Sequence, residues 1–342
     1  MEGISVRDGK YSNFTEAGAR FNACLTDCIK QKLPMIVPGG SYDFHTPLIV
    51  PSGFGTRILG TGWRAELNAM PGFNDYVIKF DSSKGDIRGF EISNLTINGN
   101  CKEQSSGGGI LASGAVESWF TKLHLFGCYN EAIKLDGISA GGFGHHNELS
   151  SSLIDGGTAS PGLGIGLVVF ASDENVITTT RFQDLGGADA FAAGLEVGAI
   201  IDRSGLQVYD KINIVNGADG LRVKDTGRVR IIGGCNFDGP RGTALIISGD
   251  RCLVEGAQFL EGKEGRSYIH MNNGTGNIIH TNGFQAPDSA KMRSFIRESG
   301  GSHNNMVNTN TLYYQDAQLS VGALERNKPR TGKWKDNIVY RS

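Results

Sequence analysis

The chain has 342 residues, with 33 Lys and Arg against 35 Asp and Glu, so its formal net charge is only −2. This balance argues against nucleic acid as a partner, because proteins that contact phosphates need an excess of basic residues. Membrane insertion is not expected either, because no stretch approaches the ~18 consecutive apolar residues of a membrane helix.

The first 33 residues are predicted to be a lead-in followed by one helix. No basic segment followed by an apolar run opens the chain, so we expect a soluble product made in the cytoplasm. Asn13 to Glu16 offer capping residues, and Ala19, Phe21, Leu25 and Ile29 then recur with helical spacing, which predicts an amphipathic helix ending near Lys32. We expect this helix to cover the open end of the structure that follows.

A regular repeat runs from about Ile87 to Tyr314, within a predicted domain of residues 34–314. A residue that is usually polar is followed, always seven positions later, by a large apolar residue: Ser118–Leu125, Asn147–Ile154, Asn175–Phe182, Gln207–Ile214, Arg230–Phe237, Cys252–Phe259, Asn277–Phe284 and Asn305–Leu312. Between these pairs lie alternating phrases such as Gly194 to Val197, Gly220 to Val223 and Ala244 to Ile247. A period of 22 to 32 residues with strand-like alternation predicts an all-β fold, a solenoid of stacked parallel strands.

The connections between predicted strands vary far more in length than the strands do. The three longest are residues 99–109, 136–146 and 184–193. Long insertions are surface loops, where functional sites tend to lie. After Tyr314 the period fades, and residues 315–342 are interpreted as a basic, aromatic tail that makes a subunit contact.

The alternating phrases predict one outward column of side chains on successive coils. Its members are Lys134, Val168, Glu196, Arg222, Ile246, His270 and Arg297. Because strands stack at ~4.8 Å, Glu196 and Arg222 should be neighbours. They could form an exposed ion pair of small value, or Glu196, Arg222 and His270 could contact a sugar substrate.

A second set of carboxylates follows the large apolar residues by one or two positions. It consists of Asp155, Asp184, Asp238 and Glu261. Glycosidases need two carboxylates, ~5 to 5.5 Å apart for retention or ~6.5 to 9.5 Å apart for inversion, and stacked coils can supply both spacings. We therefore predict catalytic carboxylates drawn from Asp184, Asp238 and Glu261. The alternative is that these residues bond their own backbone at turns.

Amide side chains immediately before the large apolar residues predict an outward ladder on the same face. Asn213, Asn236 and Gln258 form it, with Arg181 and His124 in the same register. Such a row suits a hydroxyl-rich ligand, although it could equally be a solvated surface. No metal site and no cofactor are expected, because His145–His146 has no evident third ligand.

The helix, the stretch Ile36 to Tyr42 and the glycine-punctuated coils with Asn-bearing turns resemble the pectate-lyase-like right-handed parallel β-helix superfamily, particularly its bacteriophage tailspike and virion-associated branch. The opening Asp8-Gly9 to Ala17 is a loose match to that family's usual signature and departs from it where the second Asp should stand. The resemblance implies a single-stranded right-handed β-helix, and a structural asparagine ladder formed by Asn147, Asn175, Asn277 and Asn305. It also implies a homotrimer, and location in the virion among other virion proteins. The motifs of secreted pectate lyases, polygalacturonases and alginate epimerases are absent.

Several functions remain open at this point. The first is a phage protein that binds a cell-surface polysaccharide, with or without cleaving it by hydrolysis. Cleavage by β-elimination would use His270 as the base, with Arg222 or Lys134 neutralising a uronate. The alternatives are a non-catalytic virion structural protein or adhesin, and a standalone bacterial glycan lyase, epimerase or fructotransferase-like enzyme.

Overall fold

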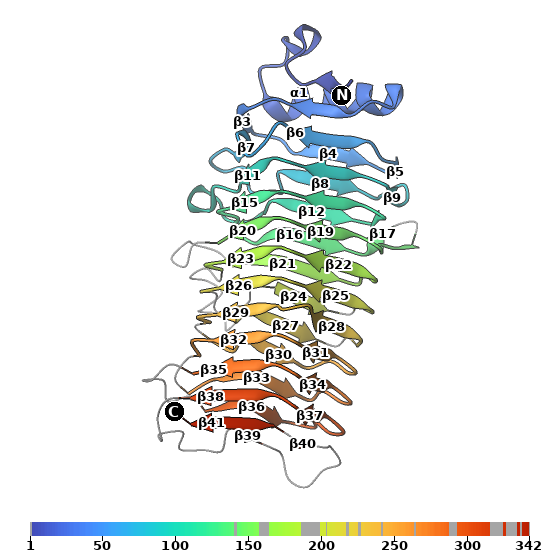
Figure 1. Cartoon of the computed structure of the whole chain (residues 1–342). Coiled ribbons are helices and arrows are strands. Elements are labelled where there is room, and N and C mark those ends of the chain that lie inside the picture. The colour runs from blue at the N-terminus through green and yellow to red at the C-terminus, as the bar shows by residue number, and fades with distance from the viewer. Residues whose placement is uncertain are drawn as a thin grey trace.

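Successive turns of the chain stack into an elongated coil, with one strand per turn in each of three long parallel sheets (Figure 1). The structure is a computed structural model that describes residues 2–139, 142–156, 164–185, 199–202, 204–216, 219–224, 227–240, 242–262, 265–286, 293–314, 324–325, 334–335 and 337–341. The predicted all-β right-handed parallel β-helix is confirmed.

In each long sheet, neighbouring strands belong to successive turns of the coil. Sheet A contains β1 (Ile4–Ser5), β2 (Met35–Val37), β6 (Arg57–Gly60), β10 (Glu91–Ser93), β14 (Trp119–Thr121), β19 (Glu148–Ser150), β22 (Asn175–Thr178), β25 (Gln207–Asp210), β28 (Val229–Ile232), β31 (Leu253–Glu255), β34 (Ile278–His280), β37 (Met306–Asn308) and β40 (Trp334–Lys335). Sheet B contains β3 (Gly40–Phe44), β7 (Ala65–Ala69), β11 (Thr96–Asn98), β15 (His124–Phe126), β20 (Leu153–Asp155), β23 (Arg181–Gln183), β26 (Asn213–Val215), β29 (Asn236–Asp238), β32 (Gln258–Leu260), β35 (Gly283–Gln285), β38 (Thr311–Tyr314) and β41 (Ile338–Arg341).

Sheet C contains β4 (Leu48–Pro51), β8 (Ile78–Asp81), β12 (Ile110–Ser113), β16 (Glu131–Asp136), β21 (Ile165–Phe170), β24 (Ala199–Asp202), β27 (Leu221–Lys224), β30 (Leu245–Ile247), β33 (Ser267–Asn272), β36 (Ser294–Ser299) and β39 (Leu324–Glu325). Two small sheets accompany them, one of β5 (Gly53–Phe54), β9 (Ile87–Arg88) and β13 (Ala115–Val116), the other a hairpin of β17 (Ile138–Ser139) and β18 (Gly142–Phe143). Two short 3₁₀ turns, η1 (Gly9–Tyr11) and η2 (Cys101–Glu103), complete the described elements.

The predicted helix is confirmed as α1 (Ala17–Gln31), at the N-terminal end of the coil (Figure 1). Glu16 caps it by accepting hydrogen bonds from the backbone N–H groups of Gly18 (2.7 Å) and Ala19 (2.6 Å). Its apolar face packs on the first coil through Phe21, whose ring meets the edges of two aromatic rings of β3 at 5.1 Å. No helix of the described residues has the length and apolarity needed to cross a membrane.

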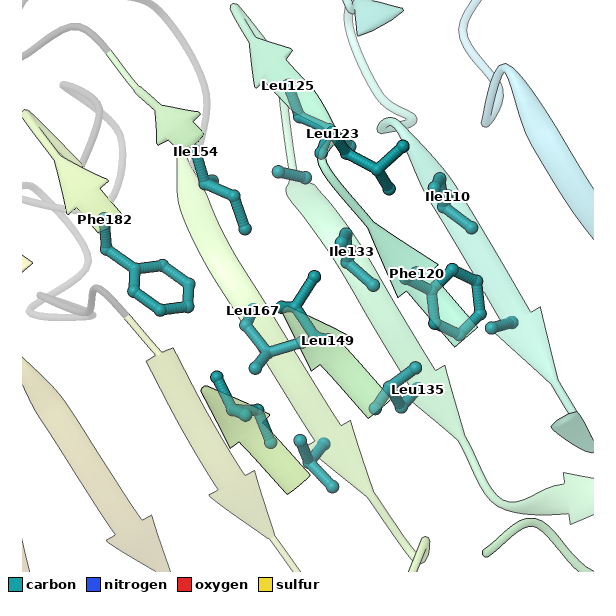
Figure 2. Close-up of a cluster of buried hydrophobic side chains, with 14 of the residues drawn as sticks. Ile110, Phe120, Leu123, Leu125, Ile133, Leu135, Leu149, Ile154, Leu167 and Phe182 are labelled. Atoms are coloured by element: carbon teal, nitrogen blue, oxygen red, sulfur yellow. The ribbon is translucent and has the colours of Figure 1, made fainter. Parts of the chain in front are cut away.

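The core consists of inward columns in which residues of successive coils stand directly opposite one another. All eight large apolar residues of the repeated phrase are in register, from Leu125 through Phe182 and Phe259 to Leu312. Figure 2 shows part of this core, where Leu125, Ile154 and Phe182 follow one another along sheet B. The recurring gap of seven thus reflects the path from sheet A to sheet B that most of these coils follow.

Buried asparagines line the corners of the coil, as the resemblance implies. Asn147 Oδ1 accepts from Ser118 N at 3.1 Å, and Asn305 Oδ1 accepts from Asn277 N at 2.8 Å. A second ladder, which was not expected from the sequence, runs through Asn282, whose Oδ1 accepts from Ala257 N at 2.9 Å. Since these amides replace water for otherwise unpaired backbone groups, they are structural.

The predicted register is wrong in the coil that contains Glu196. Ile200 of β24, and not Glu196, stands opposite Arg222, while Val168 of β21 stands on the other side of Ile200. Glu196 itself lies outside the described residues. Leu195-Glu196-Val197 alternates between apolar and polar residues, whereas Ala199-Ile200-Ile201 is apolar throughout, so periodicity alone favoured the wrong segment.

Two further predictions need correction. Val229, and not Arg230, stands opposite Gln207, because consecutive glycines 233 and 234, both with positive φ, add one residue to the turn before Phe237. The boundary at Tyr314 is also wrong, because β39, β40 and β41 add a further strand to each long sheet. A subunit contact by residues 315–342 stays a prediction.

Candidate functional site

Sheet B presents two columns of outward side chains, because most of its strands are three residues long with an inward residue in the middle. The first column contains Thr96, His124, Leu153, Arg181, Asn213, Asn236 and Gln258, and the second contains Asn98, Phe126, Asp155, Gln183, Val215, Asp238 and Leu260. The predicted register of Arg181, Asn213, Asn236 and Gln258 is therefore confirmed. Asn236 Nδ2 lies 3.3 Å from Asn213 Oδ1, which links two steps of this row.

An aromatic ridge lies at the N-terminal end of these columns. Trp63, in the corner before β7, is 51% exposed although it is a large aromatic residue. Its ring centroid lies 5.1 Å from that of His124, which lies 5.2 Å from that of Phe126. Trp63 Nε1 donates to the carbonyl oxygen of Lys122 at 3.1 Å, and this bond holds the indole in place. Aromatic faces fixed in this way can stack on the apolar faces of sugar rings.

A hollow of about 430 Å³ adjoins the ridge. It is lined by Asn98, Asn100, Cys101, Lys102, His124, Phe126, Gly127, Asp155 and Gly156. The predicted surface loop 99–109 forms one wall of the hollow. Asn100, Cys101 and Lys102 of this loop line the hollow, and Lys102 lies in its short turn η2. The hollow thus combines an apolar rim with amides, a carboxylate and an ammonium group, which is the composition of a small-molecule or glycan site.

His124 and Asp155 line the hollow together with the ammonium group of Lys102. Burial lowers the pKa of His124 below its usual value, although the charges of Asp155 and Glu66 act in the opposite direction. His124 is therefore neutral at pH 7 and can both donate and accept a hydrogen bond. Asp155 Oδ2 accepts a bond of 2.7 Å from Gln183 Nε2, so its position is fixed by the next coil.

The predicted catalytic carboxylates lie farther along sheet B and are only partly brought together. Asp184 and Glu261 both adopt a left-handed backbone, with φ of 50° and 52°, at the same corner but three coils apart, which is roughly 14 Å. Asp238 stands opposite Leu260, so it is one coil and one residue away from Glu261. Glu261 Oε2 reaches over Gly239, 3.7 Å from where a Cβ would stand on that glycine. Of the possible pairs, Asp238 and Glu261 approach one another most closely.

On sheet C the predicted column is less suited to bind a uronate. Arg222 pairs with the buried Asp219 at 3.1 Å, and Lys134 pairs with Asp136 at 3.1 Å. His270 Nε2 lies 2.6 Å from Ser299 Oγ, and Ile246 separates it from Arg222 in the column. The two cations proposed for β-elimination are thus already paired with carboxylates of their own sheet face.

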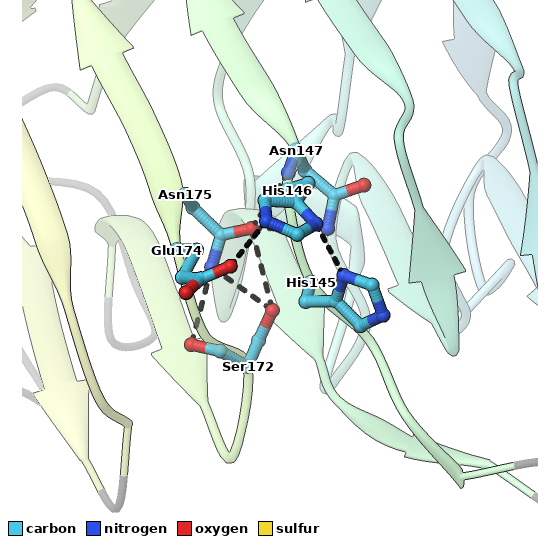
Figure 3. Close-up of polar contacts among 6 residues, drawn as sticks. All are labelled: His145, His146, Asn147, Ser172, Glu174 and Asn175. Carbon is cyan, nitrogen blue, oxygen red and sulfur yellow. Dashed lines mark hydrogen bonds and ion pairs between the residues drawn. The ribbon is translucent and has the colours of Figure 1, made fainter.

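The pair His145–His146 lies at the corner that leads into sheet A (Figure 3). The two Nδ1 atoms are 2.6 Å apart, and His146 Nε2 pairs with Glu174. Three of the four ring nitrogens thus face one another or a carboxylate, and they do not converge on a common point. Over the part of the chain that the structure describes, no three His, Cys, Asp or Glu side chains are placed to hold a metal ion.

Most parts of the hollow could be identified from the sequence, but their assembly could not. His124 was expected in the outward ladder, Asp155 among the carboxylates and residues 99–109 among the long loops. What the sequence could not supply is the path that brings Trp63 to Lys122, which is 59 residues away. A tryptophan in the glycine-containing turn Gly60 to Arg64 was the available signal.

No protein-family model matches the chain, and no curated protein matches it either. Solved structures do. ORF18 of Geobacillus virus E2 matches with a TM-score of 0.65 at 14% identity, over 99% of this chain and 61% of that one. DFA-IIIase from Arthrobacter chlorophenolicus A6, in complex with GF2, matches with 0.67 at 14% identity, over 98% and 93%. The Dettilon tailspike protein (gp208) matches with 0.59 at 14% identity, over 94% and 68%.

The chain thus spans 61% of the length of the Geobacillus virus protein. At such low identities the likeness concerns the fold, and the predicted resemblance in fold is confirmed. The chain is a right-handed parallel β-helix protein, similar in architecture to a phage tailspike and to DFA-IIIase.

Proposed function

We propose that this protein is a virion-associated phage protein that binds a cell-surface polysaccharide lengthwise along the outer face of sheet B. The observation that carries the proposal is the hollow beside the exposed Trp63. From there the row Arg181, Asn213, Asn236 and Gln258 continues over four successive coils. A polymer of neutral or mildly charged sugars would find a stacking platform at one end and hydrogen-bonding groups along its length.

Two of the structural neighbours favour a phage setting. One is a tailspike protein and another is the product of an open reading frame of a virus. A homotrimer and contacts with other virion proteins belong to the same proposal. Light scattering coupled to size-exclusion chromatography tests the trimer directly, and a monomeric mass at micromolar concentration would contradict it.

Binding is tested with capsular or exopolysaccharide from the bacterial host. Affinity electrophoresis should show retardation of the wild-type protein in gels that contain the glycan. Loss of retardation in a Trp63→Ala variant that keeps its thermal stability would place the glycan on this ridge. Unchanged retardation would remove the proposal's main support.

We further propose that Asp238 and Glu261 cleave the bound glycan by hydrolysis, one as acid and the other as base or nucleophile. Release of reducing ends from the polysaccharide measures this activity, and ultraviolet absorbance of unsaturated uronates would reveal β-elimination instead. Asp238→Asn and Glu261→Gln should each abolish release. Asp184→Asn is the matched control, because Asp184 occupies the same left-handed corner position as Glu261 but lies three coils away.

The outcomes separate the candidate functions. If reducing ends are still released by both Asp238→Asn and Glu261→Gln, these two residues are not the catalytic pair. If Asp184→Asn abolishes the release of reducing ends, Asp184 cannot serve as the control and the assignment of the catalytic acid is wrong. Binding without any release would leave a non-catalytic adhesin or structural protein. A DFA-IIIase among the structural neighbours keeps a standalone fructotransferase-like, lyase or epimerase activity as a second candidate, and fructan substrates test it in the same assay.

A further inference from the structure

The corner that leads into sheet A carries a second polar hollow, on a different part of the coil from the sheet B face. Its volume is about 580 Å³, and its lining includes Arg228, Ser248, Asp250, Arg251 and Asn273. The two arginines occupy equivalent positions on adjacent coils. Arg228 N donates to Asp250 O at 3.0 Å, and Arg251 N donates in the same way to Thr275 O at 2.9 Å. Their backbones are therefore one coil spacing apart, ~4.8 Å.

Both arginines adopt a left-handed backbone conformation, with φ of 64° for Arg228 and 55° for Arg251. This conformation costs a residue with a Cβ roughly 1–2 kcal/mol, and glycine or asparagine relieves the cost. The next two coils have Gly276 and Asn304 at the same corner position, each with positive φ. Upstream coils place Glu117, His146 and Glu174 at this corner, also with positive φ. The left-handed conformation therefore belongs to the corner of the coil and does not distinguish the two arginines.

Charge does distinguish this pair of residues. Arg228 and Arg251 lie at the corner, before β28 and β31, where like charges on adjacent coils repel one another. Both arginines are exposed at the surface. Neither forms an ion pair with any residue that the structure describes. Asp250 lies in the same hollow, but its Oδ1 accepts a hydrogen bond of 2.7 Å from Thr275 N, so it is held at the backbone.

The upstream half of the same corner is built differently. There His146 faces Glu174 on the next coil, and the two side chains pair with one another (Figure 3). The downstream half, with Arg228 and Arg251, carries two guanidinium groups beside a hollow and one engaged carboxylate. A hollow lined by two like charges without ion-pair partners among the described residues attracts an ion of the opposite charge.

We propose that Arg228 and Arg251 form a binding site for an oxyanion carried by a glycan, either the carboxylate of a uronic acid or a phosphate group. Guanidinium groups bind both anions through paired N–H···O bonds. The two guanidinium groups, whose backbones are one coil apart, can bind one anion from both sides. Ser248 in the lining of the hollow adds a hydroxyl donor. The site is independent of the sheet B face, so it stands or falls separately from the proposed polysaccharide binding.

The test measures the affinity of the full chain for sodium glucuronate and for sodium phosphate by calorimetry, with sodium chloride at the same ionic strength as reference. Wild-type protein should bind at least one of the two anions, and which one it binds identifies the source of the charge. Arg228→Asn or Arg251→Asn alone should weaken binding by about tenfold or more, because each removes charge-assisted hydrogen bonds. The matched control is Arg230→Asn, an exposed arginine on strand β28 of the same coil, which should bind like wild type.

Thermal unfolding separates a binding role from a structural one. Asparagine tolerates the left-handed conformation, so without anion the double variant should unfold at the wild-type temperature or slightly above it. The anion should then raise the unfolding temperature of the wild type only. The proposal is overturned if neither anion binds the wild type more tightly than chloride, if the double variant still binds, or if the double variant is destabilised without anion.

Discussion

Replacement of Trp63 by alanine tests the sheet B face most sharply. A fully exposed tryptophan offers about 250 Å² of surface, and Trp63 is 51% exposed, so about 125 Å² is open to a ligand. A sugar ring stacked on one face would cover about half of that area. At ~25 cal/mol per Å² this contact contributes about 1.5 kcal/mol, or roughly a tenfold change in Kd.

We therefore expect Trp63→Ala to weaken binding of the host polysaccharide by about tenfold, and Trp63→Phe to keep part of the affinity because a smaller ring remains. The matched control is Trp119→Ala, since Trp119 is 43% exposed but lies on sheet A. Calorimetric titration with purified oligosaccharide measures all four proteins. Wild-type affinity in Trp63→Ala, or an equal loss in Trp119→Ala, would refute the placement of the ligand.

Three predictions concern the stability of the coil. Asn282→Ala leaves the buried N–H of Ala257 without its acceptor, so chemical denaturation should show a loss of about 3 kcal/mol or more in the free energy of unfolding. The control Asn236→Ala, on the outer face, should cost under about 1 kcal/mol. Equal losses in the two variants would contradict the structural role of the asparagine ladder. Phe259→Ala removes the middle of three rings stacked at 4.8 and 4.7 Å and should cost about 3–5 kcal/mol, so a loss below about 1 kcal/mol would show that these coils are not stacked as described. Burial opposes ionisation of Glu16, but hydrogen bonds from His45, Ala19, Gly18 and Thr46 outweigh the effect of burial and lower the pKa of Glu16. The ionised carboxylate should therefore stabilise the fold at neutral pH, and this stabilisation should be lost as the pH falls below about 4.5. Glu16→Gln should flatten that part of the curve of stability against pH.

Much of the fold could be predicted because one coil imposes the same geometry many times. The gap of seven between Asn175 and Phe182, for example, recurs wherever the chain passes from sheet A to sheet B without an insertion. Repetition makes such a distance visible in a single sequence. The α1 helix was equally accessible, since Glu16 and the apolar spacing after it act locally.

The failures have a common physical cause, which is that register is fixed by contacts between coils and not within one. Residues 195–197 alternate more regularly than residues 199–201, but the pairing of Ile200 with Arg222 places residues 199–201 in the sheet. An extra glycine before Phe237 shifted one polar position from Arg230 to Val229 in the same way. One such shift reverses which side chains face outward.

The candidate site was harder to predict than the fold for the same reason. Trp63, Lys102, His124 and Asp155 come from separate coils and corners, and no pair of them is close in sequence. The sequence did predict that the side chains of His124 and Asp155 point outward, because these residues lie next to Leu125 and Ile154 of the repeat. The hollow between them depends on how the loop 99–109 folds back, and periodicity contains no information about that.

The most direct test of polysaccharide binding along sheet B is a crystal structure of the protein soaked with an oligosaccharide from the polysaccharide that it binds. We predict sugar density over Trp63, His124 and Phe126, continuing along sheet B toward Asn236. Ordered sugar on sheet A or sheet C, with the sheet B face empty at saturating concentration, would contradict this placement.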